Sequence, residues 1–407
     1  MKILMHSNAP HVGTGYGKQT AQLARRLRDA GHDIAVSAFY GLQGSVMDWE
    51  GIPVYPQGVR PYGDDVITAH AEDHFGGDLQ AGLILTLVDA WVLPADMLAE
   101  CNCAMWAPVD HHPIPPRVIK ALTESKCWPV AMSKHGQQQM LATGLDAVYA
   151  PHGIDTKLLE PKDQTLARER TGVPKDVFCV GMVAANKGAP SRKGFCEAFQ
   201  AFAAFHKRHP EAVLYLHTEV TGAVEGVNLL NLALACDIPP SAVRTMHQYR
   251  GFVLGAPDEH MPYLYSSFDV LLNPSHGEGF GVPIVEAQAC GVPVIVTDTT
   301  SMSELVGPGW KVPGQKWWTP QESWATVPSV PKLTAALEAA FKKARRPEVK
   351  QAARDFALGY DADVVFEQYW VPILAEFDRR IGSDGPVVQT MGGELPEVVV
   401  ETMGQAA

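Results

Sequence analysis

Residues 273–295 read NPSHGEGFGVPIVEAQACGVPVI and directly follow the apolar run Val270–Leu272. Such a run is typical of a buried strand in a parallel sheet. The loop after it has glycines at 277, 279 and 281, which let the backbone turn sharply and approach a ligand closely. Pro283 suits the first turn of a helix that we expect to reach about Cys290. This strand–loop–helix order points free N–H groups at the space above the strand ends, which favours a phosphate ligand.

Two carboxylates border this predicted pocket. Glu278 lies in the loop, and Glu286 lies in the early helix. Carboxylate oxygens there would accept hydrogen bonds from sugar hydroxyls. Taken singly, Glu286 is also explained as complementing the helix dipole, and Glu278 as a solvated loop acid. The whole combination of glycines, proline and carboxylates favours a ligand site.

The same alternation of strands and helices extends through the chain. Apolar runs form one series at 2–6, 34–39, 81–88, 102–108 and 129–132, and a second at 177–183, 212–217, 270–272 and 292–297. A polar, charged stretch separates the two series. Successive βα units of this kind predict parallel sheets with right-handed crossovers. We therefore expect an α/β protein made of two Rossmann-like domains that face a cleft.

The expected boundaries follow from this pattern. The N-terminal Rossmann-like domain covers residues 1–155, a linker covers 156–176, and the C-terminal Rossmann-like domain covers 177–361. Apolar residues at helical spacing predict a C-terminal helix over 362–381, interrupted by Pro372. The tail, 382–407, has no helical period and is expected to be disordered.

Composition narrows the class of protein. The chain has 407 residues, a formal net charge of −12 and seven cysteines. No apolar run approaches the roughly 20 residues of a membrane span, and the cysteine spacing fits reduced thiols better than disulfides or zinc. The acidic balance argues against a surface built for nucleic acid or anionic lipid. We expect a soluble, cytoplasmic enzyme.

Residues 273–295 resemble the donor-site signature of the retaining GT-B glycosyltransferases of family 4, whose mark is two glutamates separated by seven residues. Glu278 and Glu286 have that spacing. The resemblance covers roughly residues 1–380. It implies that Glu286 binds the ribose of a nucleotide sugar, and that Glu278 and the backbone of Gly279, Phe280 and Gly281 hold the transferred sugar.

The N-terminal glycine loop resembles the family loop that borders the phosphates and the acceptor. The resemblance implies that Gly15 lies on the donor side and that Gly13, Thr14 and Tyr16 lie on the acceptor side. The loop lacks the Gly-x-Gly-x-x-Gly spacing of dinucleotide-binding folds, and no acidic ribose-binding residue follows at the usual distance. A dehydrogenase is therefore the lesser interpretation.

Basic residues after the first strand of the second domain are candidates for binding the diphosphate. The family usually places an Arg and a Lys-Gly pair there. Lys193-Gly194 fits the Lys-Gly pair, the usual Arg position holds Ala or Asn, and Arg192 or Lys187 is available to replace its charge. Cations at this point would stabilise the negative charge that develops on a diphosphate leaving group. The alternative is that all three are solvated surface residues.

The segment Asp110-His111-His112 follows a predicted strand of the first domain. Family members often place a histidine here that faces the transferred sugar. The order of the residues departs from the family pattern, so Asp110, His111 and His112 all remain candidates for the catalytic site. The histidines are also explained as capping a turn before a proline-rich stretch.

Tryptophans 310, 317, 318 and 324 gather in a segment rich in proline and glycine. They could stack on a sugar or a base, or pack an irregular insertion against the second domain.

The resemblance implies a metal-independent hexosyltransferase with retention of configuration, with no cofactor besides a nucleotide sugar. UDP-glucose is the favoured donor, and GDP- and ADP-sugars stay open. A soluble acceptor is favoured over a modified base in DNA or a protein side chain. A nucleotide-sugar epimerase or phosphorylase on this fold and a non-catalytic GT-B scaffold are the rival functions.

Overall fold

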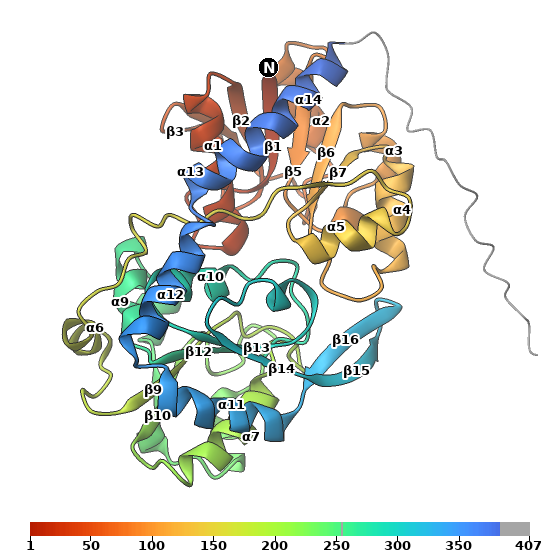
Figure 1. Cartoon of the computed structure of the whole chain (residues 1–407). Helices are drawn as coiled ribbons and strands as arrows, with labels where there is room; N and C mark the ends of the chain where they lie inside the picture. Colours follow the sequence, from red (N-terminus) through yellow and green to blue (C-terminus); the bar gives the residue numbers. More distant parts are fainter. Residues whose placement is uncertain (254, 383–407) are drawn as a thin grey trace, which may run out of the picture.

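A computed structural model describes residues 1–253 and 255–382. It contains two mainly parallel sheets, one in each half of the chain (Figure 1), and residues of both halves line a cavity between them. The expected α/β class with two Rossmann-like domains is confirmed. No helix in these residues has the length and apolar character of a membrane span.

The first sheet has eight strands in the order β3-β4-β2-β1-β5-β6-β7-β8. All its pairs are parallel except β3–β4. The strands are β1 (Lys2–Asn8), β2 (Asp33–Tyr40), β3 (Met47–Trp49), β4 (Ile52–Tyr55), β5 (Gly82–Thr86), β6 (Cys103–Ala107), β7 (Trp128–Ala131) and β8 (Val148–Tyr149). The helices of this half are α1 (Gly15–Asp29), α2 (Ile67–Phe75), α3 (Ala95–Leu98), α4 (Pro116–Glu124) and α5 (Lys134–Leu141).

The second sheet is parallel, in the order β11-β10-β9-β12-β13-β14. Its strands are β9 (Phe178–Val183), β10 (Ala212–His217), β11 (Val243–Thr245), β12 (Val270–Asn273), β13 (Val294–Thr297) and β14 (Gly309–Val312). The helices are α7 (Phe195–His206), α8 (Leu229–Ala235), α9 (Met261–Ser266), α10 (Val282–Ala289) and α11 (Val330–Lys343). Strands β15 (Gly314–Thr319) and β16 (Ser323–Pro328) form a separate antiparallel hairpin.

Both sheets reverse their strand order at a central pair. The chain moves outward from β1 to β2 and β4, then returns to place β5 on the other side of β1. It repeats this with β9, β10 and β11 before β12. The loops that leave the carboxyl ends of the two central strands must diverge to opposite faces of the sheet, which opens a crevice between them. Each half therefore contributes one such crevice to the cleft.

Two stretches connect the halves. The predicted linker contains α6 (Gln164–Thr171), whose Asp163 caps the helix by accepting from the Leu166 N–H. After α12 (Pro347–Leu358), the chain returns to the first half through α13 (Ala362–Val365) and α14 (Val371–Ile381). Figure 1 shows these last helices running from one half to the other.

The returning helices are fixed to the first half by aromatic packing. The rings of Trp370 and Trp106 meet edge-on with their centroids 4.9 Å apart, and the ring of Phe377 stacks on that of Trp128 with a centroid distance of 4.7 Å. Pro372 lacks a backbone N–H, so the normal helical bonding is broken there, and the turn before it, Phe366–Trp370, has the wider π form. The predicted interruption at Pro372 is thus a change of helical bonding within a continuous helical path.

Some elements differ from the expected ones. The first helix begins at Gly15, because the Thr14 hydroxyl accepts from the Gly17 N–H and caps it. Strands β3, β4, β8, β11, β14, β15 and β16 were not expected. Apart from Gly382, the tail predicted to be disordered lies outside the described residues.

Replacing Phe377 with Ala tests the packing of α14. Its side chain is 2% exposed, so the cavity should lower the free energy of unfolding by about 3–5 kcal/mol. Val371, on the same helix, is 41% exposed, and its replacement with Ala should cost less than about 0.5 kcal/mol. Urea unfolding followed by circular dichroism compares the two variants. Equal losses would contradict the docked position of α14.

Candidate active site

The candidate site lies where the loop after β12 meets the loop after β6. A side-chain carbon added at Gly277 would lie 2.0 Å from the backbone oxygen of Asp110, and one added at Gly279 would lie 2.3 Å from Cβ of Pro108. The two halves of the chain therefore touch through backbone at this point. Glu278, between the two glycines, is held at the junction.

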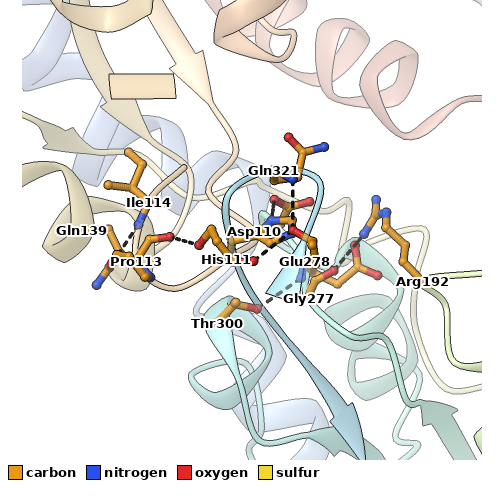
Figure 2. A network of polar contacts seen from close by, with 12 residues as sticks. Asp110, His111, Pro113, Ile114, Gln139, Arg192, Gly277, Glu278, Thr300 and Gln321 are labelled. Carbon is orange, nitrogen blue, oxygen red and sulfur yellow. Dashed lines mark hydrogen bonds and ion pairs between the residues drawn. The ribbon is translucent and has the colours of Figure 1, made fainter. Parts of the chain in front are cut away.

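Two cations from the loop after β9 bind the Glu278 carboxylate. Figure 2 shows one of them, Arg192, with Glu278 and Gly277. Lys193 Nζ lies 2.6 Å from one oxygen and Arg192 Nη1 lies 3.3 Å from the other. The Arg192 guanidinium also donates to the Gly277 carbonyl at 2.8 Å. Sequence reasoning listed Glu278, Arg192 and Lys193 as separate candidates, and the fold brings all three into contact.

Electrostatics keeps Glu278 ionised. Burial alone would raise the pKa of Glu278, but the charges of Lys193 and Arg192 and the hydrogen bond from Lys193 lower it to about 2. Burial lowers the pKa of Lys193, and Glu278 opposes that change. Glu278 raises the pKa of Arg192. The result is a fixed anion beside two cations, in a place where its side chain is 10% exposed.

Hydroxyl groups fix the backbone of the same loop. Thr300 Oγ1 accepts from the Glu278 N–H at 3.1 Å, and Ser301 Oγ donates to the carbonyls of Glu278 and Phe280 at 2.8 and 2.6 Å. The loop conformation therefore does not depend on a ligand.

Different structural requirements explain the three glycines of this loop. Only Gly281, at φ 109°, among the three adopts the left-handed conformation that favours glycine. Gly277 and Gly279 are required by the close approach of the first half. Gly277 and Gly279 therefore serve contact between the halves, and the close approach of a ligand to this loop stays a prediction.

In the segment after β6, one histidine is buried against Asp110 and the next is exposed. His111 Nδ1 bonds Asp110 Oδ1 at 2.6 Å, and its ring is buried, whereas His112 is exposed. Burial would raise the pKa of Asp110, but the His111 hydrogen bond and the Arg192 charge lower it to about 2. Asp110 is thus an ionised group close to the cations that bind Glu278.

The N-terminal glycine loop borders the same region. Thr14 Oγ1 accepts from Asn8 at 2.6 Å, and Gly13 and Gly15 have open space where a side chain would be. Burial, with the charges of Asp89 and Asp110, raises the pKa of Tyr16. The hydroxyl of Tyr16 therefore stays neutral and able to donate.

Sequence reasoning missed Asp89. It follows β5, on the other side of the crevice from Tyr16. Burial is the main cause that raises the pKa of Asp89, and the negative charge of Asp110 raises it further. Its signal was present in the sequence, because a polar residue directly after a predicted strand at 81–88 stands at the carboxyl edge of a parallel sheet.

Asn186 and Lys187, at and next to the usual Arg position, do not join the cations that bind Glu278. Asn186 is buried, and its amide donates to the carbonyls of Glu219 and Val227, so it holds two loops together. Lys187 is exposed.

Glu286 lines a separate part of the cleft, a cavity of about 480 Å³ between the halves. Tyr265 donates to its carboxylate at 2.6 Å. Lys18, another residue that sequence reasoning missed, lines the same cavity and pairs with Asp258 at 3.0 Å. In the described ranges, no cluster of three or more His, Cys, Asp or Glu side chains suits a metal ion.

Replacing Glu278 with Gln should make stability less sensitive to acid. The folded pKa of about 2 lies below the ordinary value of 4.5, so the charge of Glu278 contributes stability above pH 4.5 that is lost as the pH falls toward 2. The free energy of unfolding of the wild type should exceed that of the variant by about 3 kcal/mol at pH 7, and this difference should shrink at pH 3.

Urea unfolding at pH 7, 4.5 and 3 measures this difference. Glu367→Gln, at an exposed position, is the control and should follow the wild type at each pH. Parallel curves for the wild type and Glu278→Gln would contradict the ionised, paired state.

Comparison with known proteins supports the fold described above. Residues 174–327 match the family model described as "Glycosyl transferases group 1". A 60-residue segment is 50% identical to the O-antigen chain mannosyltransferase B of Escherichia coli, over 15% of this chain and 15% of that protein. Other curated relatives, 28–31% identical, are covered over only 32–42% of their length.

Solved structures match almost the whole chain at low identity. Sucrose-phosphate synthase from Thermosynechococcus elongatus superposes with a TM-score of 0.72 at 16% identity, covering 93% of this chain and 99% of that one. Anabaena HepE in complex with UDP-glucose superposes with a TM-score of 0.65 at 18% identity, covering 92% and 100%. The chain therefore has the GT-B fold, and its residues 174–327 are similar to the group 1 glycosyl transferases.

Proposed function

We propose that this protein is a glycosyltransferase that moves a sugar from a nucleotide-sugar donor to a hydroxyl group of an acceptor. The observation that carries the proposal is the contact of Glu278 with Lys193 and Arg192, opposite Asp110. It combines an anion suited to sugar hydroxyls with cations suited to a diphosphate. The family match of residues 174–327 supports it.

The cations have a role in bond cleavage. Breaking the bond between the sugar and the diphosphate builds negative charge on the leaving group, which Lys193, Arg192 and the N-terminus of α10 would stabilise. Glu286, fixed by Tyr265, would accept from the ribose hydroxyls. We assign the donor diphosphate to Lys193 and Arg192, because both contact Glu278, and give Lys187 no part in it.

We also propose that configuration is retained, as the family resemblance implies. A diphosphate oxygen takes the proton of the acceptor hydroxyl, the acceptor oxygen bonds to the sugar carbon, and the bond from that carbon to the diphosphate breaks on the same face. This route needs no side-chain nucleophile. Asp110, held by His111, would bond hydroxyls of the transferred sugar.

UDP-glucose is the favoured donor. One structural neighbour was solved with UDP-glucose, and one relative is a mannosyltransferase, so a GDP-mannose donor is the second candidate. Transfer is proposed to need no metal ion and no other cofactor, and to take place in the cytoplasm. An epimerase or phosphorylase would need no hydroxyl acceptor, and a scaffold would bind no nucleotide.

Calorimetric titration with UDP, GDP and ADP, in the presence of EDTA, tests the donor site. We expect selective binding of one nucleotide. Lys193→Ala should weaken the binding of that diphosphate at least tenfold and leave the binding of its nucleoside unchanged, since a charge-assisted bond to phosphate is lost.

Lys187→Ala is the matched control and should change affinity less than twofold. Equal weakening of diphosphate and nucleoside would contradict the role of Lys193. Absence of binding to all three nucleotides would favour the scaffold. With the donor known, Glu278→Ala should abolish transfer to acceptor while nucleotide binding persists.

A further inference from the structure

The β15–β16 hairpin presents large aromatic rings to solvent. Trp318 is 51% exposed and Trp324 is 37% exposed, and their rings meet edge-on at 4.9 Å. Figure 1 shows the hairpin projecting from the second half beside the loop after β6. Neither the sheets nor the contacts of the donor loop account for these exposed rings. Large exposed apolar groups gathered in one place mark binding surfaces.

Backbone bonds fix the hairpin to both sides of the candidate site. The His112 N–H donates to the Trp324 carbonyl at 3.1 Å, and the Trp324 N–H donates to the His112 carbonyl at 3.3 Å. Two residues further along β16, the Thr326 N–H donates to the His276 carbonyl at 2.8 Å. The hairpin is therefore held at a constant position relative to Asp110 and Glu278, each of which lies two residues from one of these contacts.

Strand pairing places Trp324 between His112 and Trp318. His112 is the antiparallel bridge partner of Trp324, and Trp324 lies opposite Trp318 in the hairpin. Directly opposed residues in antiparallel strands point to the same face, with neighbouring side chains about 5 Å apart. Trp324 and Trp318 thus form an aromatic row that begins at the backbone bridge to His112, two residues from Asp110 in the chain, whereas the ring of His112 itself lies 6.1 Å from that of His135. The preceding residue, His111, points the other way, to Asp110.

We propose that the aromatic row binds a saccharide portion of the acceptor. This assignment rests on the proposed function and adds the substrate class of its acceptor. A pyranose ring has an apolar face of C–H groups that stacks on an indole, and hydroxyl edges that reach polar neighbours.

Charge argues for a neutral sugar over other flat or apolar ligands. The hairpin, residues 314–328, contains one basic residue, Lys316, and one acidic residue, Glu322. Nucleic acid requires several cations along its path, and an anionic membrane surface requires a basic face. The aromatic row offers neither.

The test measures saccharide binding by the full-length protein with its preferred nucleotide present. A microarray of immobilised oligosaccharides probes the wild type, Trp318→Ala, Trp324→Ala and the corresponding Phe variants. The wild type should retain a defined set of saccharides, and each Ala variant should lose about tenfold in affinity, since one ring contact is removed. The Phe variants, which keep a stacking face, should lose less.

Gln315→Ala, on the opposite face of β15, is the control and should bind like the wild type. Thermal melting confirms that each variant is folded. Titration with the nucleotide shows whether each variant still binds the donor nucleotide, independently of saccharide binding. Equal saccharide binding by wild type and Ala variants would overturn the aromatic row as the acceptor site. Failure of the wild type to retain any saccharide while still binding nucleotide would overturn the saccharide assignment alone. Failure to bind nucleotide would instead count against the proposed function.

Discussion

The buried ion pair between Glu278 and Lys193 constrains the rest of the site. A carboxylate this deeply buried is strongly unfavourable unless a cation and hydrogen bonds compensate it. Compensation comes from a different loop, the one after β9, so the loops after β9 and β12 must lie side by side. They do so because β9 and β12 are neighbours at the point where the strand order reverses. The chemistry of the site is thus a consequence of the topology of the sheet.

The same constraint extends to the first half of the chain. Gly277 and Gly279 let Asp110 and Pro108 approach the Glu278 loop, and Glu304 accepts from the N–H groups of Lys134 and His135 at the start of α5. At the opposite side of the cleft, the two connections meet where the Ile154 N–H donates to the Tyr360 carbonyl and the Ala362 N–H donates to the Ile154 carbonyl. The halves therefore touch at the site and at the chain crossing, with the cavity lined by Glu286 between these contacts.

Patterns in the sequence were sufficient for the central strands and for the donor loop. Buried parallel strands are continuous apolar runs, and a glycine-rich turn followed by proline marks the start of a helix. The outer strands were not predicted because β3, β11 and β15 are short or exposed and lack an apolar run.

Long-range contacts were beyond the same reasoning. The sequence offers no sign that Gly277 opposes Asp110, or that His112 pairs with Trp324, because both contacts join distant segments of the chain. The alternation that sends His111 inward and His112 outward depends on this pairing, so the choice among Asp110, His111 and His112 could not be made from residue types. Once the pairing is known, position separates the two histidines. His111 supports the charge of Asp110 in the candidate site, and His112 pairs through its backbone with the hairpin. Charged groups thus concentrate where a phosphate bond would break, and neutral aromatic rings occupy the path along which an acceptor would approach.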